Sequence, residues 1–492
     1  MATVPVLRCH TFASVTVLIA ALGVLQTSAA ASLPLTDCRL ENAIGAANAK
    51  CGWYEVAEDR DHPEGVRIKI HVAVVPALRR QPLPDPIFVL SGGPGQAASD
   101  FYLGASGSFE TLRRNRDIVV IDQRGTGRSN RLDCVLPDEL ESESFDAALV
   151  SRYTEKCLAK LPGDPRFYTT SVAVRDLEDI RRALGYAQVN LYGISYGTRV
   201  AQHYLRRYPD LVRTVTLDGI VPTDAILGPE VAPAAQQAVN AILARCQQAP
   251  DCAATFPHVA QTLADLLKKL SLRTSMVTLA DPRTGVQRTM EFSNVQLAVA
   301  LRLHSYSDIS AALLPYLITE AAAGRAEAMA AQALLVARDL GDQMANGMHN
   351  AVVCTEDVPF FTPEALADPA ISASFMGEAF VKTLQSMCAV WPRGILDADF
   401  HQPLQSNKPA LLLSGENDPV TPVRFGEHAK QGYANGLHIV VPQQGHGQVT
   451  STCLAKVFTQ FVVDGSVSHL DTACVAKQFA TPFMLNASGP SP

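Results

Sequence analysis

The sequence reads VNLYGISYG over residues 189–197. Its first four residues form a largely apolar run typical of a buried strand, and a helical stretch follows the motif as far as Pro209. The remainder has the pattern G-x-S-x-G, with Gly193 and Gly197 on either side of Ser195. A Cβ at either glycine would collide with neighbouring backbone, and a turn from strand to helix would expose the serine hydroxyl. Ser195 is therefore the candidate nucleophile.

Strand patterns recur on both sides of this turn and alternate with helical patterns; most are short apolar runs, whereas residues 66–75 alternate, with Arg67, Lys69 and His71 on one face. These strand patterns cover residues 66–75, 87–90, 118–121, 212–217, 410–413 and 438–441. Short apolar strands that alternate with helices predict an α/β fold with a largely parallel sheet.

The middle of the chain has a different pattern. Ala-rich helical patterns dominate residues 223–407, and strand patterns nearly vanish there. We expect a helical cap inserted into a core that covers residues 32–222 and 408–484. Residues 485–492 are predicted to form a disordered tail.

A serine nucleophile needs a base, and the base needs an acid that orients it. His446 is the candidate base, because it lies between two glycines just after a late strand and follows the chain order Ser, acid, His. Asp418 is the favoured acid, since its loop and the histidine loop belong to the same returning segment. Asp218 is the rival because it also ends a strand, and its alternative role is to cap a loop before Gly219.

Acyl transfer also needs donors for the oxyanion. The turn itself places the backbone N–H of Tyr196, and we expect the second donor to be the Gly93 amide in the Gly-rich loop at 91–95. No Lys-Ser/Thr follows that loop, which excludes a phosphate-binding P-loop. The loop at 122–129 lacks the third glycine of a dinucleotide site, so we expect it to support the oxyanion loop.

Composition and charge exclude several classes of protein. Hydrophobic residues make up 47% of the 492 residues, which is too much apolar material for a disordered chain. Lys and Arg total 41 against 48 Asp and Glu, for a formal charge of -7, so a nucleic-acid partner is not expected. Beyond the N-terminus, no apolar run of about 18 residues is free of charge and proline, which excludes a polytopic membrane protein.

The N-terminus predicts a signal peptide over residues 1–31. Arg8 precedes a short apolar run at 12–25, and small residues at 28–31 match a signal-peptidase site. An uncleaved anchor is the alternative, but the run is short for a membrane span and no basic stop-transfer segment follows it. We expect export to the periplasm or the medium, with no stable membrane insertion after the signal peptide is removed.

Cysteine usage agrees with export. Removal of Cys9 with the signal peptide leaves ten of the 11 cysteines, an even number. Sequence alone does not determine their pairing, and we expect neighbours to pair because short loops close with the least entropy. The expected pairs are Cys38 with Cys51, Cys134 with Cys157, Cys246 with Cys252, Cys354 with Cys388, and Cys453 with Cys474. No C-x-x-C or H-E-x-x-H spacing is present, so no metal site is expected.

Five motifs together resemble a known family. They are SGGPG at 91–95, DQRGTGRS at 122–129, GISYG at 193–197, DPVTP at 418–422 and GHG at 445–447. In this order they are similar to the proline iminopeptidase and tripeptidyl aminopeptidase family of α/β-hydrolase serine peptidases. The resemblance runs from about residue 66 to residue 474 and is closer to the exported tripeptidyl aminopeptidase branch.

The resemblance implies an α/β-hydrolase fold, a mostly parallel central sheet and a large helical cap. It implies release of one to three residues from the free N-terminus of a peptide by a Ser-His-Asp acyl-enzyme mechanism, which requires no cofactor. In this family, acidic cap residues bind the substrate ammonium, which makes Glu356 the first candidate anchor and Asp357 the second. Their alternative role is that of a carboxylate pair at a helix start or on the surface.

One residue departs from the family pattern, because the oxyanion motif usually begins with His and this chain has Ser91. A serine keeps a loop hydrogen bond but not the same contacts, so loop geometry and substrate preference are open. Two other functions compete with the aminopeptidase: a secreted carboxylesterase that uses the same triad on small esters, and a catalytically silent binding protein. The oligomeric state stays open.

Overall fold

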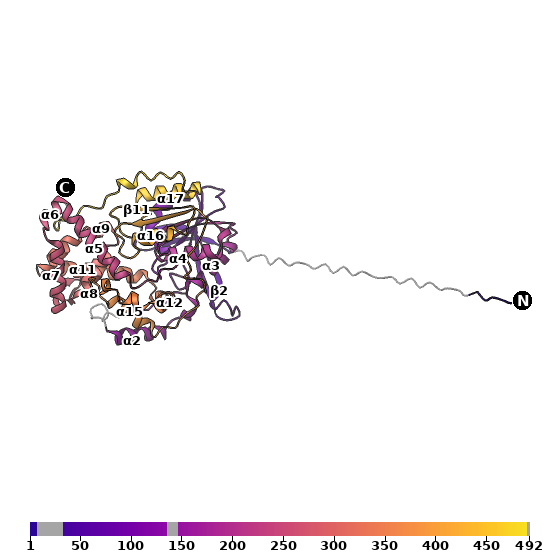
Figure 1. Ribbon diagram of the computed structural model, residues 1–492, viewed down its shortest axis with the longest axis horizontal. Helices are drawn as coiled ribbons and strands as arrows, with labels where there is room; N and C mark the ends of the chain where they lie inside the picture. The colour runs from indigo at the N-terminus through magenta and orange to yellow at the C-terminus, as the bar shows by residue number, and fades with distance from the viewer. Residues whose placement is uncertain (7–32, 135–145, 490–492) are drawn as a thin grey trace. The chain divides into compact units, whose positions relative to one another are not determined.

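The computed structural model describes residues 1–6, 33–134 and 146–489. The predicted signal peptide lies outside the described residues, apart from its first six positions, as do the last three positions of the predicted tail. The chain divides into residues 1–31 and residues 32–492, and the fold is that of the second unit (Figure 1).

A nine-stranded sheet with the order β1-β2-β3-β5-β4-β6-β7-β10-β11 forms the centre of this unit. The strands are β1 (Thr36–Glu41), β2 (Ala46–Ala57), β3 (Arg67–Val75), β4 (Ile87–Leu90), β5 (Ile118–Ile121), β6 (Val189–Ile194), β7 (Val212–Asp218), β10 (Ala410–Gly415) and β11 (Gly436–Val441). From β5 to β11 every pairing is parallel, whereas β1, β2 and β3 pair antiparallel at one edge. The predicted, mostly parallel sheet is therefore confirmed.

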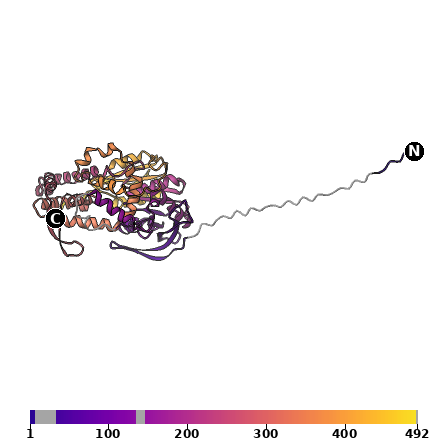
Figure 2. The same ribbon diagram turned by 90° about the horizontal axis from the view of Figure 1, so that it is seen from below.

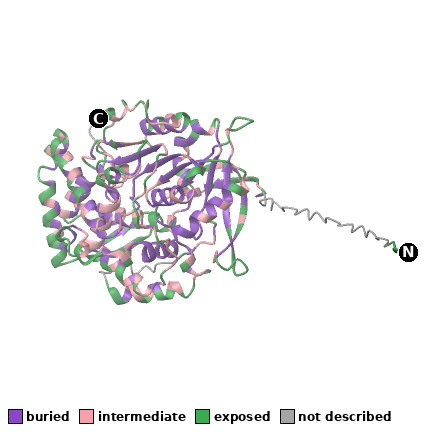
Figure 3. Ribbon diagram, turned by 45° about the vertical axis from the view of Figure 1, so that its right-hand side comes forward, coloured by how far each residue is buried: buried purple, intermediate pink, exposed green. Residues whose placement is uncertain are grey.

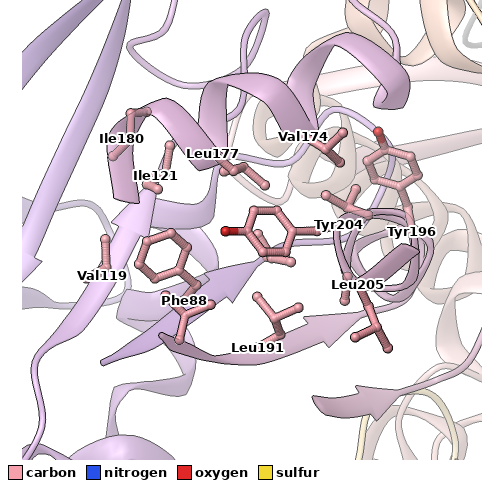
Figure 4. Close-up of a cluster of buried hydrophobic side chains, with 14 of the residues drawn as sticks. Phe88, Val119, Ile121, Val174, Leu177, Ile180, Leu191, Tyr196, Tyr204 and Leu205 are labelled. Carbon is pink, nitrogen blue, oxygen red and sulfur yellow. The ribbon is translucent and has the colours of Figure 1, made fainter. Parts of the chain in front are cut away.

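Helices cover both faces of the sheet, which explains why β4 and β5 are wholly apolar. Phe88 and its alternate neighbours on adjacent strands pack against α3 (Thr170–Ala183) and α4 (Tyr196–Arg207), as Figure 4 shows. Ile87 and Val89 point to the other face, toward α1 (Ala98–Arg113) and α17 (Thr452–Asp464). Because side chains alternate along a strand, a strand covered on both faces must be apolar throughout.

The segment between β7 and β10 is the predicted helical cap. Its helices are α5 (Val231–Gln248), α6 (Pro250–Thr255), α7 (Val259–Leu272), α8 (Asn294–His304), α9 (Asp308–Ala311), α10 (Leu314–Ala322), α11 (Glu327–Gln343), α12 (Asn346–Glu356), α13 (Pro363–Leu366), α14 (Pro369–Ser372) and α15 (Ala379–Cys388). Helices α5 to α11 enclose a hydrophobic core of their own and gather together in both ribbon views (Figures 1 and 2). Figure 3 shows the contrast in burial between the sheet strands and the outer faces of these helices.

The expectation that strands nearly vanish in the cap was wrong at one place. Strands β8 (Ser275–Ala280) and β9 (Gln287–Phe292) form an antiparallel hairpin there. Asp281 accepts hydrogen bonds from the backbone N–H of Arg283 and Thr284 and so closes the turn. Both strands are half-exposed and bury only alternate residues, so the strand pattern is weak beside that of the Ala-rich helices.

The remaining short elements connect the core. They are α2 (Ala147–Leu158), α16 (Val423–Lys430) and the 3-10 helices η2 (Pro165–Phe167), η3 (Pro209–Leu211), η4 (Val358–Phe360) and η5 (Val475–Lys477). All five disulfides join the cysteine neighbours expected from the sequence. Among the described residues, no helix combines the length and the apolar character that crossing a membrane requires.

Candidate active site

The turn after β6 holds Ser195 in a backbone conformation that non-glycine residues rarely adopt. Its φ is 56° and its ψ is -126°, and its N–H donates to the Asp218 carbonyl oxygen over 2.8 Å. A Cβ on Gly193 would lie 2.3 Å from the Gly197 carbonyl oxygen, and one on Gly197 would lie 2.2 Å from that of Leu90. Both glycines are therefore required by close backbone contacts, as the sequence predicted.

The structure brings His446 and Asp418 together. His446 Nδ1 lies 2.7 Å from Asp418 Oδ2, and the Thr421 hydroxyl donates to the same oxygen over 2.7 Å. The backbone N–H groups of Val420 and Thr421 donate to Oδ1 over 2.9 and 2.8 Å. Because the buried carboxylate only accepts, Nδ1 of His446 carries the proton and Nε2 is left as the basic nitrogen.

The charges around His446 suit a general base. Burial by itself lowers the pKa of His446, but the Asp418 carboxylate and its hydrogen bond raise that pKa above the ordinary value. Asp218 adds to the rise, and Arg302 opposes it.

Asp218, the rival acid, joins the two loops instead. It is fully buried, and its carboxylate accepts from the backbone N–H of Gln448 at 2.7 Å and of Val449 at 2.9 Å. Tyr192 donates to it from β6 over 3.0 Å. Since the Asp218 main chain also bonds to Ser195, this one residue holds the histidine loop beside the nucleophile turn.

The Gly-rich loop runs beside the serine. A Cβ on Gly92 would lie 3.0 Å from Ser195 Cβ and 3.5 Å from its Oγ. Gly93 has a φ of 108°, and the Ser91 hydroxyl donates to the Gln96 carbonyl over 2.6 Å, so this serine keeps a loop hydrogen bond. The oxyanion roles of the Gly93 and Tyr196 amides stay predictions.

The loop at 122–129 contacts the start of α1 and the core. Asp122 accepts from the N–H of Ser99 at the start of α1, and Arg124 forms a buried ion pair with Asp176. Asp122 and Arg124 thus make structural contacts, and support of the oxyanion loop by this segment stays a prediction.

The sequence matches the α/β-hydrolase fold family over residues 85–449. The chain belongs to this family. The matched span includes all five motifs and most of the chain, so the α/β-hydrolase fold predicted from the resemblance is confirmed. In this α/β hydrolase, the turn with the candidate nucleophile Ser195, the Asp418–His446 pair and the Gly-rich loop all follow parallel strands of the sheet.

Several relatives of this α/β hydrolase are peptidases by name. Serine protease Hip1 of Mycobacterium tuberculosis is 25% identical over 89% of this chain and 90% of that protein. Tripeptidyl aminopeptidase of Streptomyces lividans is 30% identical over 35% of each chain. Putative hydrolase YuaR of Escherichia coli is 30% identical over 28% of each chain. The chain thus spans less than two thirds of two of these relatives but nine-tenths of Hip1, and the predicted resemblance to this peptidase group is confirmed.

A solved structure of a named peptidase is also similar to this chain. The crystal structure of proline iminopeptidase from Mycobacterium smegmatis is 16% identical and covers 84% of this chain and 98% of that chain, with a TM-score of 0.36. A likeness of that level carries no argument about activity.

Glu356 and Asp357 lie at the end of α12, buried against the nucleophile helix α4. Glu356 accepts from the Thr170 N–H at 2.7 Å, and Asp357 forms a two-point ion pair with Arg199 at 2.9 and 3.0 Å. Their exposed fractions are 0% and 1%. Burial raises the pKa of Glu356 to about 7, although Arg199 acts in the opposite direction. An ammonium would have to displace these partners, so the anchor role stays a prediction.

Cap residues that sequence reasoning missed reach the same site. The Tyr306 carbonyl accepts from the His446 N–H over 2.8 Å, and the two rings are 5.4 Å apart. His349 Nδ1 lies 3.3 Å from the Pro94 carbonyl, and the Ala345 N–H donates to Gly95. No motif marked these residues, because their contacts join segments far apart in the sequence.

Thr421 was also missed, although it lies inside the DPVTP motif at 418–422 and so could have been found.

Among the described residues, no cluster of three His, Cys, Asp or Glu side chains could hold a metal ion.

Proposed function

We propose that the chain is an exported serine aminopeptidase that releases one to three residues from the free N-terminus of peptides. The observation that carries the proposal is the contact of 2.7 Å between His446 and Asp418, on a loop that Asp218 holds beside Ser195. The names of the relatives support a peptide substrate.

The geometry supports a two-step acyl transfer. His446 takes the proton of the Ser195 hydroxyl as that oxygen attacks the scissile carbonyl, and Asp418 stabilises the imidazolium. The N–H groups of Tyr196 and Gly93 stabilise the oxyanion of the tetrahedral intermediate. His446 then protonates the departing amine. In the second step water attacks the acyl-enzyme as His446 takes its proton, and His446 returns a proton to Ser195 as the acyl group leaves.

The test is a panel of p-nitroanilides of Pro, Ala-Ala, Ala-Ala-Pro and N-acetylated Ala-Ala-Pro, with p-nitrophenyl butyrate beside them. An aminopeptidase cleaves only the substrates with a free amine, and the best length determines how many residues it releases. Equal cleavage of the acetylated substrate contradicts exopeptidase action, and turnover of the butyrate alone indicates the carboxylesterase instead.

The same panel tests the ammonium anchor. If Glu356 binds the substrate amine, Glu356→Gln raises KM for free-amine substrates and leaves the butyrate kinetics unchanged. A parallel loss on both substrates would instead mean that Glu356 only holds α12 against α4.

Export is tested on the full chain. Expressed with its own N-terminus, the protein should be recovered from the periplasm or the medium, with a mass that lacks the first 31 residues and includes five disulfides. Retention of the full mass in a membrane fraction would favour the uncleaved anchor.

A further inference from the structure

Arg302 is a cap arginine that pairs with no carboxylate among the described residues. It lies half-buried on α8, and one terminal nitrogen donates to the Tyr306 hydroxyl over 3.2 Å. Its guanidinium carbon lies 5.8 Å from the ring centre of Tyr306 and 5.3 Å from that of Phe380. Its Nε is buried and has no hydrogen-bond acceptor, and the guanidinium forms no salt bridge within the part of the chain that the structure describes.

This cation lies close to the proposed base. Tyr306, which holds the guanidinium, packs its ring against His446 and accepts the N–H of that residue. Burial lowers the pKa of His349, and the charge of Arg302 adds to the effect. The same charge opposes the rise in the pKa of His446 that Asp418 and Asp218 cause.

The reaction determines which part of the substrate lies near His446 and Tyr306. His446 must protonate the departing amine, so the departing part of the peptide lies on the His446 side of the scissile bond. The Tyr306 ring packs against His446, and the Tyr306 hydroxyl accepts a hydrogen bond from Arg302. A guanidinium repels an ammonium, so the free amino end of the substrate belongs on the opposite side, with the acyl group.

We propose that Arg302 binds a carboxylate on the departing part of the peptide and so selects substrates that carry one close to the scissile bond. The inference rests on the proposed function. A guanidinium presents paired N–H donors that match a carboxylate, and an unpaired charge in a half-buried site is stabilised when a ligand supplies its counter-charge. Two sources fit this chemistry: the C-terminal carboxylate of a short peptide and an acidic side chain just after the scissile bond.

The experiment extends the best peptide of the p-nitroanilide panel by one residue, in four forms: Ala with a free carboxylate, Ala amide, Glu amide and Gln amide. The wild-type enzyme should cleave the acid about 10- to 100-fold faster than the amide, measured as kcat/KM, with most of the difference in KM. The Glu and Gln amides distinguish a side-chain carboxylate from a C-terminal one.

The variants are Arg302→Gln and Arg302→Lys, with Arg325→Gln as the matched control. Arg325 lies on the cap surface, where it pairs with Glu320, so its loss should leave every ratio unchanged. Arg302→Gln should bring the acid-to-amide ratio near 1, and Arg302→Lys should keep part of it. Each ratio is internal to one preparation, so partial unfolding of a variant does not affect it.

The pH profile provides a second readout. Loss of the Arg302 charge lets the pKa of His446 rise further, so the acidic limb of kcat/KM should move to higher pH in Arg302→Gln and not in Arg302→Lys. A wild-type acid-to-amide ratio near 1 for both pairs overturns the proposal for Arg302 even when free-amine p-nitroanilides are cleaved. No turnover of any peptide overturns the proposed function and this inference with it.

Discussion

Ser195 occupies a left-handed backbone conformation that costs on the order of 1–3 kcal/mol and persists only when its surroundings hold it. The hydrogen bond from its N–H to Asp218 and the two glycines beside it provide those surroundings. A residue held in this way suits a role that needs an exposed hydroxyl at one defined place.

Ser195→Ala should lower kcat for the best p-nitroanilide by a factor on the order of 10⁵–10⁶, because nothing replaces the attacking oxygen. The variant should unfold at the wild-type temperature and should not react with a fluorophosphonate probe. Turnover within tenfold of the wild type would contradict the assignment of the nucleophile.

Asp418→Asn should lower kcat by about 10⁴, since an amide no longer holds the Nδ1 proton in place. The carboxylate raises the pKa of His446, and the base must be neutral to act, so the acidic limb of the wild-type profile should lie above about pH 6.5. In the variant that limb should move to lower pH. An unshifted limb with unchanged kcat would return Asp218 to consideration as the acid.

Glu356 should make stability depend on pH. Its folded-state pKa of about 7 lies above the ordinary value of 4.5, so its contribution is fully present below about pH 4.5 and is lost as the pH rises through 7. Glu356→Gln does not titrate. As the pH rises from about 4.5 to above 7, the free energy of unfolding of the wild type should therefore fall by about 3 kcal/mol relative to that of the variant. Urea unfolding at both pH values measures this difference, and parallel curves would contradict it.

At the scale of elements, the nucleophile helix α4 and the cap helix α12 are joined by buried charge. Arg199 on α4 pairs with Asp357 just after α12, and its guanidinium also donates to the Ala225 carbonyl. Such a pair favours one relative orientation of the two helices, although a buried ion pair contributes little net stability by itself.

Asp357→Ala should cost about 3–5 kcal/mol of stability, because it removes the nearer of the two carboxylates that pair with the buried Arg199 charge and leaves only Glu356, at 3.6 Å. Thermal and urea unfolding measure the loss, and exposed Asp210→Ala is the matched control. The double variant Arg199→Met with Asp357→Leu should recover much of the loss. If Asp357→Ala were as stable as the control Asp210→Ala, the ion pair would not stabilise the contact between the two helices.

At the scale of the whole molecule, the disulfides close loops of different length. Cys354 and Cys388 are 34 positions apart, whereas Cys246 and Cys252 are six apart. Replacing the first pair by Ala should cost about 4 kcal/mol, and replacing the second about 2 kcal/mol, because a longer loop loses more entropy when it is closed. Urea unfolding compares the variants, and the reverse order would contradict this expectation.

Local patterns predicted much of the fold. The strands that carry the nucleophile turn, the Gly-rich loop and the acid are largely apolar and lead into Gly, Ser or Asp, so their positions were readable from the sequence. The antiparallel strands β1 and β2 and the hairpin β8–β9 were not predicted, because they are partly exposed and their alternation is weak.

The sequence by itself determined that Ser195, Asp418 and His446 follow strands of one parallel sheet, because a strand pattern and its turn are local properties of the chain. Only the tertiary structure decided that Asp418 contacts His446 while Asp218 holds the histidine loop, and that Tyr306, to which Arg302 donates, packs against the base. Asp218 and Gln448 are 230 positions apart, and no local pattern encodes a contact at that distance. Such contacts depend on how the packed sheet and cap bring distant segments together, which the burial of both apolar cores determines.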